Sequence, residues 1–230
     1  MLLRDNFARI QENIGAACEA SGREVSSVTM VAVSKKQVPT VVQEYISLCQ
    51  QIGTNCILGE NYVQEFATKK RELSGIFQSH GIGHLQRNKV KTALELFDVI
   101  ESVDSMKIAL EINKHALACG KVFPVFLEIN ISDDSAKHGF PAEVEAFKDL
   151  FNAVALRVVG LMTITKFYED PNQARPDFQK LAMLGSKLRK DLNLPRPLEL
   201  SMGMSADYVQ AIEEGATVVR IGSALFGERK

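Results

Sequence analysis

Two adjacent lysines follow the first apolar run of the chain. Residues 30–39 read MVAVSKKQVP, so Lys35 and Lys36 stand where a buried strand would end. A lysine amine in such a place can form a Schiff base with an aldehyde or ketone. Residues two apart share a strand face, so Lys35 lies on the face of Val31 and Val33, and Lys36 on the opposite face. One lysine can enter a site at the strand end, but the alternation does not say which.

Two further segments have the composition of an anion site. SMGMSAD at 201–207 and RIGSA at 220–224 each combine a glycine, a hydroxyl group and the start of a predicted helix. The first amides of a helix lack backbone acceptors and lie at its positive end, so both segments can bind a phosphate. The alternative is a pair of capped turns that bind nothing.

A lysine amine within reach of a bound phosphate suggests two chemistries, pyridoxal 5′-phosphate (PLP) attached to the lysine or a sugar-phosphate aldolase. Arg220 helps to separate them, because arginine is a known partner of the PLP pyridine nitrogen. Arginine stays protonated, so it would keep that nitrogen neutral and make the ring a poor electron sink. The alternative is a surface arginine or an ion pair with Glu199 on the neighbouring predicted strand.

The elements that must position these residues are short apolar runs that alternate with helical patterns. Several runs are apolar at nearly every position, which is typical of strands covered on both faces in a parallel sheet. We predict strands at 29–33, 56–58, 77–82, 98–103, 122–129, 156–162, 198–202 and 218–221. We predict helices between them at 40–51, 62–73, 85–96, 105–118, 142–152, 176–192 and 206–214.

Eight strands that alternate with helices predict an α/β fold, a single (β/α)₈ TIM barrel over residues 1–230. The chain after the last strand is too short for a full closing helix, so we expect an extra N-terminal helix to cover that seam. In a closed barrel the eighth strand neighbours the first, which brings the lysines and the anion segments to one rim. An open doubly wound sheet is the alternative, but no G-x-G-x-x-G follows the first strand.

The bulk composition excludes several classes of protein. Of the 230 residues 46% are hydrophobic and 24% charged, and the formal net charge is −1 with scattered basic residues. We therefore expect no nucleic-acid or membrane partner. The N-terminal segment is amphipathic and interrupted by charges, unlike a signal peptide. The cysteines (Cys18, Cys49, Cys56 and Cys119) lack metal-ligand spacing, so we predict reduced thiols, a cytoplasmic protein and no metal site.

Six motifs occur here in an order that resembles one family. They are VAVSK, GENYVQE, GHLQRNK, GLMTI, LSMGMSADY and VVRIGSALFG. Together they resemble the pyridoxal phosphate homeostasis protein family, the YggS-type proteins, over nearly the whole chain. SMGMS followed by VRIG is the specific pair, whereas VAVSK alone is not. The resemblance implies a barrel of the alanine racemase N-terminal-domain type with PLP as its cofactor.

Position by position, the resemblance also implies the site. Lys35, not Lys36, would hold PLP as an internal aldimine, Arg220 would partner the pyridine nitrogen, and Met162 would pack against the ring. The implied phosphate ligands are Ser201, Gly222 and Ser223. The chain departs from the family's aromatic pattern at 79–83, where it reads SHGIG, and we expect His80 to be a hydrogen-bonded core residue.

The resemblance implies a cytoplasmic, monomeric protein that stores PLP and delivers it, with PLP-dependent apoenzymes as possible partners. The alternative is a single-domain amino-acid racemase of fold type III. Racemisation between two bases needs an acid on each face of the substrate. The spacing of the tyrosines (Tyr45, Tyr62, Tyr168 and Tyr208) does not require any of them to face the cofactor. We therefore expect no efficient turnover.

Overall fold

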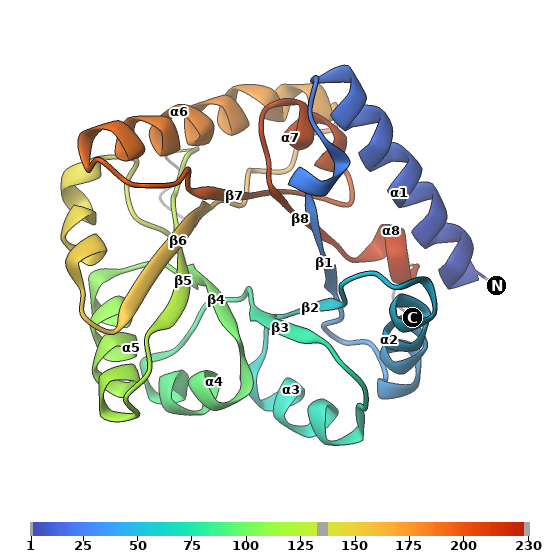
Figure 1. The fold of residues 1–230 in the computed structure, drawn as a ribbon, viewed down its shortest axis with the longest axis horizontal. Coiled ribbons are helices and arrows are strands. Elements are labelled where there is room, and N and C mark those ends of the chain that lie inside the picture. The colour runs from blue at the N-terminus through green and yellow to red at the C-terminus, as the bar shows by residue number, and fades with distance from the viewer. Residues whose placement is uncertain (1, 133–137, 228–230) are drawn as a thin grey trace.

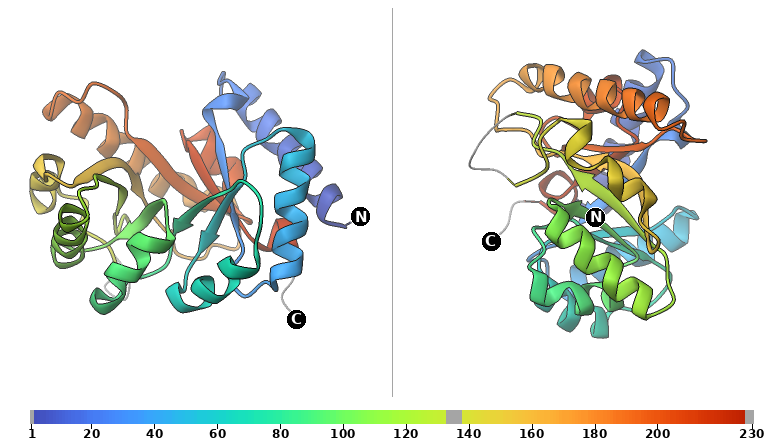
Figure 2. Two further views of the ribbon diagram at one scale, coloured as in Figure 1. Left: turned by 60° about the horizontal axis from the view of Figure 1, so that its bottom comes forward. Right: turned by 90° about the vertical axis from the view of Figure 1, so that its left-hand side faces the viewer.

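The structure is a computed structural model that describes residues 2–132 and 138–227. Its strands form a closed parallel barrel in the order β1 to β8, with the helices on the outside (Figures 1 and 2). This confirms the predicted (β/α)₈ fold. The strands are β1 Thr29–Val33, β2 Ile57–Glu60, β3 Gln78–Gly81, β4 Val99–Val103, β5 Phe123–Glu128, β6 Leu156–Met162, β7 Glu199–Met204 and β8 Val218–Ile221.

Helices follow the strands as predicted, with one exception. They are α1 Leu2–Ala20, α2 Pro39–Ile52, α3 Val63–Lys69, α4 Val90–Leu96, α5 Met106–Ala118, α6 Arg175–Asp191, α7 Tyr208–Glu213 and α8 Ser223–Phe226. The predicted helix at 142–152 is wrong as an α-helix, because two 3₁₀ turns, Val144–Ala146 and Lys148–Asn152, stand there. Phe147 and Leu150 are buried three residues apart, and side chains at that spacing align on a 3₁₀ turn.

The seam between β8 and β1 closes the barrel, and α1 covers it. α8 has only four residues, and α1 lies beside it and α7, outside β1 and β8 (Figure 1). The Asn6 amide donates to the Leu225 carbonyl at 3.0 Å, and the Asn13 amide donates to the Tyr208 hydroxyl at 2.8 Å. This arrangement confirms the expected role of the N-terminal helix.

Alternate residues of each strand face the barrel interior. The interior cluster contains Val31, Ile57, Phe126, Met162 and Val218, whereas Ala32 and Leu58 pack in the larger cluster between strands and helices. The interior is densely filled, because a Cβ on Gly59 would lie 2.7 Å from Val31 Cγ1 and 3.6 Å from Val33 Cγ2. Val31 and Val33 therefore mark the inner face of β1.

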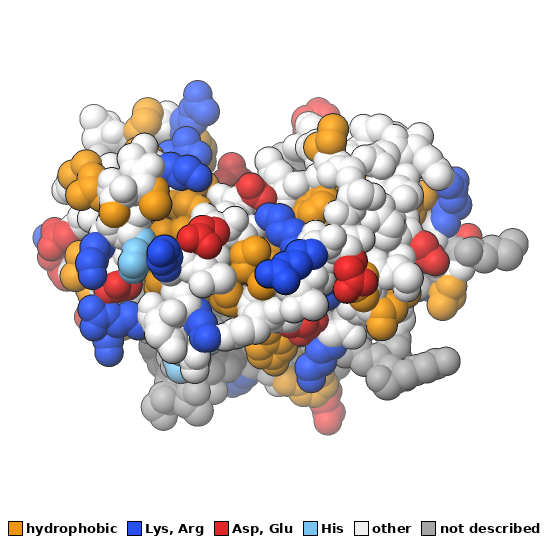
Figure 3. Space-filling view, turned by 90° about the horizontal axis from the view of Figure 1, so that it is seen from below, with side chains coloured by type: hydrophobic (Ala, Val, Ile, Leu, Met, Phe, Trp, Pro, Cys, Tyr) orange, Lys and Arg blue, Asp and Glu red, His pale blue; other side chains and the backbone are white. Residues whose placement is uncertain are grey.

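The outer surface mixes charges of both signs. On the face seen from below Figure 1, Lys and Arg side chains lie among Asp and Glu side chains and small apolar areas (Figure 3). This distribution agrees with the scattered basic residues of the sequence. Within the described residues, no helix combines the length and the apolar character that crossing a membrane requires.

Candidate functional site

Lys35 follows the carboxyl end of β1 and is half-buried. The strand pairing continues past β1, because the Ser34 amide donates to the Gly59 carbonyl at 3.0 Å. Alternation continued through Ser34 predicts that Lys35 follows Val33 on the inner face. Lys35 and Lys36 form a turn, which the Gln37 amide closes by donating to the Ser34 carbonyl at 3.1 Å, and Lys36 is exposed with a φ of 60°. This geometry favours Lys35 over Lys36 as the lysine at the site.

The backbone around Lys35 is held from outside the barrel by a buried lysine on α3. The Lys69 ammonium group donates to three oxygens, those of the Ser34 carbonyl (2.7 Å), Glu60 (2.7 Å) and Glu65 (2.9 Å). The Ser34 hydroxyl donates to the same Glu60 oxygen at 2.8 Å. Burial raises the pKa of Glu60 although the hydrogen bond and the charge of Lys69 act in the opposite direction. This outer network fixes the residue before Lys35.

A second network crosses the barrel interior and ends at Arg220. The guanidinium is 4% exposed and donates to Ser201 Oγ at 2.6 Å and to the Thr163 carbonyl at 2.7 Å. Ser201 Oγ in turn donates to Glu101 Oε2 at 2.5 Å. The other Glu101 oxygen lies 2.5 Å from His80 Nδ1. His80 is thus a buried, hydrogen-bonded residue, as predicted, and the proposed ion pair of Arg220 with the exposed Glu199 is wrong.

Burial and neighbouring charges have opposite effects on several pKa values in this interior. Burial lowers the pKa of Arg220, and the charges of Glu101 and Glu128 oppose that change. Burial alone would raise the pKa of Glu101, but the His80 hydrogen bond and the charges of His80 and Arg220 lower it overall. Glu128 differs, because burial and the charge of Asp104 raise its pKa to about 7. One buried cation therefore stands among several carboxylates.

The segments after β7 and β8 meet at the start of α8. Ser205 Oγ accepts hydrogen bonds from the amides of Gly222 (3.1 Å) and Ala224 (3.3 Å). Gly203 has a φ of 89°, and a Cβ there would lie 2.5 Å from the Ala211 Cβ, so the irregular part of β7 between Ser201 and Met204 requires glycine. The sequence motif contained this second serine, but its spacing did not single it out.

The start of α8 lies beside the end of β1, which Lys35 follows. Ala32 pairs with Ile221 across the β1–β8 seam, and a Cβ on Gly222 would lie 3.4 Å from the Val33 Cβ. The structure therefore brings Lys35, Arg220 and Gly222 to the same rim of the barrel.

The other predicted site residues differ in how deeply they are buried in the barrel. Ser223 is exposed at the start of α8, and Met162 is fully buried in the interior cluster. Ser201 is also fully buried, with its hydroxyl engaged by Arg220 and Glu101. Its assignment to a phosphate stays a prediction, and the contacts of Ser205 make that residue a further candidate.

The fold and the site together define a class of protein, the barrels of the alanine racemase N-terminal-domain type. The family described as alanine racemase, N-terminal domain matches residues 6–230. The chain belongs to the pyridoxal phosphate homeostasis protein family. It is 40% identical to the member from Aquifex aeolicus over 98% of each chain. It is 39% identical to the human member, over 96% of this chain and 84% of that protein.

Solved structures agree with this membership. PipY of Synechococcus elongatus, determined with PLP bound, is 31% identical and has a TM-score of 0.81, over 95% of this chain and all of that one. An alanine racemase from Clostridium difficile has a TM-score of 0.71 over 99% of this chain and 56% of that one. Its identity of 16% shows a shared fold alone.

Proposed function

We propose that this chain binds PLP at the carboxyl rim of its barrel and serves in PLP homeostasis, as a store from which the cofactor is released. The names of its relatives support the function, and the structure of PipY with PLP bound supports the cofactor. The observation that carries the proposal is the pairing of Ala32 with Ile221, which sets the strand that precedes Lys35 against the start of α8.

The residues at this rim fit the three functional parts of PLP. The hydroxyls of Ser205 and Ser223 suit a phosphate, which would replace Ser205 Oγ as the acceptor of the Gly222 and Ala224 amides. The buried guanidinium of Arg220 suits a ring nitrogen that stays unprotonated. When bound, PLP supplies an aldehyde that a lysine amine can attack and a ring that withdraws electrons from the attached group.

Each remaining residue has a positioning role in this proposal. Ser201 and the Thr163 carbonyl orient Arg220, because both accept from its guanidinium. Met162 fills the interior beneath the rim, where its thioether offers an apolar contact to a ring. Lys35 provides the amine, and Lys69 holds the backbone that presents it.

Positions of the tyrosines argue against the racemase alternative. The Tyr208 hydroxyl is bonded to Asn13, the Tyr168 hydroxyl donates to Asp177, and Tyr45 is buried against Phe7 beneath α1. Tyr62, at the start of α3, is 49% exposed and is the remaining candidate for a second acid. Optical rotation of an L-amino acid mixed with holo protein tests this alternative. Racemisation that Tyr62→Phe abolishes would support a racemase over a PLP store.

An absorbance spectrum before and after borohydride reduction tests the proposal, with the modified residue located by mass spectrometry. We expect a yellow protein and a stable adduct on Lys35. Lys35→Ala should lose both the visible band and the adduct, whereas the matched variant Lys36→Ala should keep them. The reverse result would reassign the lysine. A colourless protein that traps a ketose phosphate would favour an aldolase.

Three features of the proposal concern the whole chain. We propose that residues 1–230 act as one PLP-binding domain, that the protein works as a monomer, and that it works in the cytoplasm. Sedimentation of the holo protein at the 25.4 kDa of a single chain is the expected result for the monomer.

A further inference from the structure

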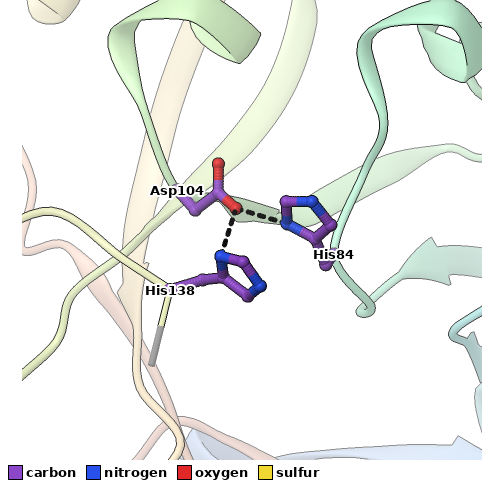
Figure 4. Close-up of side chains that lie close together, drawn as sticks. All are labelled: His84, Asp104 and His138. Carbon is purple, nitrogen blue, oxygen red and sulfur yellow. Dashed lines mark hydrogen bonds and ion pairs between the residues drawn. The ribbon is translucent and has the colours of Figure 1, made fainter. Parts of the chain in front are cut away.

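Three potential metal ligands meet at the rim of the barrel, away from the proposed PLP site. His84 follows β3, Asp104 follows β4, and His138 comes from the segment after β5 (Figure 4). Their candidate ligand atoms all lie within 4.8 Å of one another. β4 stands opposite β8 in the ring of eight strands, so this cluster and the start of α8 lie on different sides of the barrel.

Both imidazoles present the same nitrogen to one carboxylate oxygen. His84 Nδ1 lies 2.6 Å from Asp104 Oδ2, and His138 Nδ1 lies 3.9 Å from that oxygen. The two rings stack with centroids 4.0 Å apart and planes 15° apart. Metal–ligand bonds of about 2.1 Å in a tetrahedral site separate the ligand atoms by about 3.4 Å. The two separations from Asp104 Oδ2 lie on either side of this value.

The surrounding contacts hold the ligands in place. The second Asp104 oxygen accepts from the Ser105 hydroxyl at 3.0 Å, which leaves Oδ2 directed at the histidines. Phe140 donates its amide to the Glu128 carbonyl at 2.8 Å, and this pairing keeps the chain next to His138 beside the end of β5. Outer contacts of this kind orient the ligands in metal sites.

The charge at this point also favours a cation. Asp104 is buried, and Glu128 is close enough to interact electrostatically with both Asp104 and His84. Two carboxylates in a partly buried position raise the affinity for a divalent ion. The histidine side chains, 46% and 61% exposed for His84 and His138, leave a path by which the ion can enter.

We propose that His84 Nδ1, Asp104 Oδ2 and His138 Nδ1 bind one divalent transition-metal ion of the zinc class, with a fourth position open to water. Two imidazoles and one carboxylate suit Zn²⁺, Co²⁺, Ni²⁺ or Fe²⁺, whereas Ca²⁺ and Mg²⁺ prefer oxygen ligands alone. Such an ion would tie together the segments that follow β3, β4 and β5. The site does not depend on the proposed PLP function.

Calorimetric titration of untagged, chelator-stripped protein with Zn²⁺ tests the proposal, and the Co²⁺ absorbance spectrum reports the ligand geometry. We expect one ion per chain and a tetrahedral Co²⁺ spectrum. His138→Gln should weaken binding at least about tenfold, because it removes a direct ligand. This variant is decisive because its side chain is exposed, whereas Asp104→Asn changes a buried residue that could affect folding.

His115→Gln is the matched control, since His115 pairs with Glu111 on α5 at 3.0 Å outside this cluster. Its affinity for Zn²⁺ should equal that of the wild type. The same titration of Lys35→Ala separates the site from chelation by PLP, and its Zn²⁺ binding should persist. No saturable binding, or binding that survives both His84→Gln and His138→Gln, would overturn the proposal.

Discussion

Arg220 is a buried cation in a hydrogen-bond network that joins several strands. Its guanidinium is bonded to Ser201 on β7 and to the Thr163 carbonyl just after β6, with Glu101 of β4 one contact away. Removing one partner of a buried charged network leaves the others uncompensated, which costs several kcal/mol. At the scale of single residues, this network therefore serves both stability and the proposed cofactor contact.

Replacing Arg220 tests both roles. We expect Arg220→Gln to lower the free energy of unfolding by about 3 kcal/mol, because Glu101 loses its cation. The borohydride adduct on Lys35 should remain, while the visible absorbance should become more dependent on pH, since the ring nitrogen can then take up a proton. Denaturant titration and spectra across pH measure the two effects. A spectrum unchanged at every pH would argue against the contact.

Glu128 allows a pH prediction. Burial first, and then the charge of Asp104, raise its pKa to about 7, above the ordinary value for glutamate. A carboxyl with a raised pKa in the folded state contributes stability below its unfolded pKa, and that contribution is lost as the pH rises through about 7. The wild type should therefore lose stability relative to Glu128→Gln by up to about 3 kcal/mol between pH 5 and pH 8.

Denaturant unfolding with a chelator present, at each pH, measures this difference. The exposed Glu199→Gln is the control and should run parallel to the wild type. If the curves of Glu128→Gln and the wild type stay parallel over this range, Glu128 does not titrate as stated.

At the scale of elements, α1 and α8 together cover the seam between β8 and β1. α8 is too short to cover β8, and α1 takes the position that a longer last helix would fill. Phe7, Ile10 and Ile14 of α1 are buried there. Burial of a large apolar side chain contributes about 1.5–3 kcal/mol, so α1 supplies a substantial part of the net stability.

Deleting residues 1–20 should therefore expose the seam and yield insoluble or unfolded protein. Expression followed by circular dichroism and a thermal melt measures the outcome. Arg4→Ala is a suitable control, because its bond to Gln51 is exposed and its loss should change little. A truncated protein that stays folded with an unchanged melting temperature would contradict the role given to α1.

At the scale of the whole molecule, the proposed PLP site lies at one end of the barrel, and the apolar clusters that stabilise the fold occupy the rest. Of the predicted cofactor residues, Lys35 follows β1 and Gly222 and Ser223 follow β8, whereas Met162, Ser201 and Arg220 lie within β6, β7 and β8. The apolar clusters fill the interior and the layer under the helices. Sites of barrel proteins lie at this carboxyl end, where segments change without disturbing the core. A store of cofactor needs an accessible rim of this kind.

Release of the cofactor is the corresponding prediction. Holo protein mixed with a PLP-dependent apoenzyme should restore that enzyme's activity over time, because the attachment to Lys35 is reversible. Lys35→Ala, treated in the same way, should restore markedly less activity. Enzyme assays at matched protein concentrations measure this. If both proteins reactivate the apoenzyme equally, Lys35 does not hold the transferable cofactor.

Much of the fold follows from local patterns in the sequence. The apolar runs predict all eight strands to within two residues at either end, because a strand buried on both faces needs apolar side chains at consecutive positions. The 3₁₀ turns after β5 were not predicted, since Phe147 and Leu150 also fit a helical pattern. Alternation along β1 restricted the site to one lysine of a pair, and the choice of Lys35 stays a prediction, supported by its half-burial beside the exposed Lys36.

The sequence by itself therefore determined the barrel, and it predicted the rim proposed to bind the cofactor and the residue types at that rim, because these depend on periodicity and short motifs. Only the tertiary structure decided that Ser205, not Ser201, contacts the amides at α8, and that Arg220 bonds to Ser201 instead of Glu199. It also joined His84, Asp104 and His138, which no spacing rule connects. Contacts between distant segments depend on how the strands close into a barrel. Local sequence patterns do not specify which side chains meet when it closes.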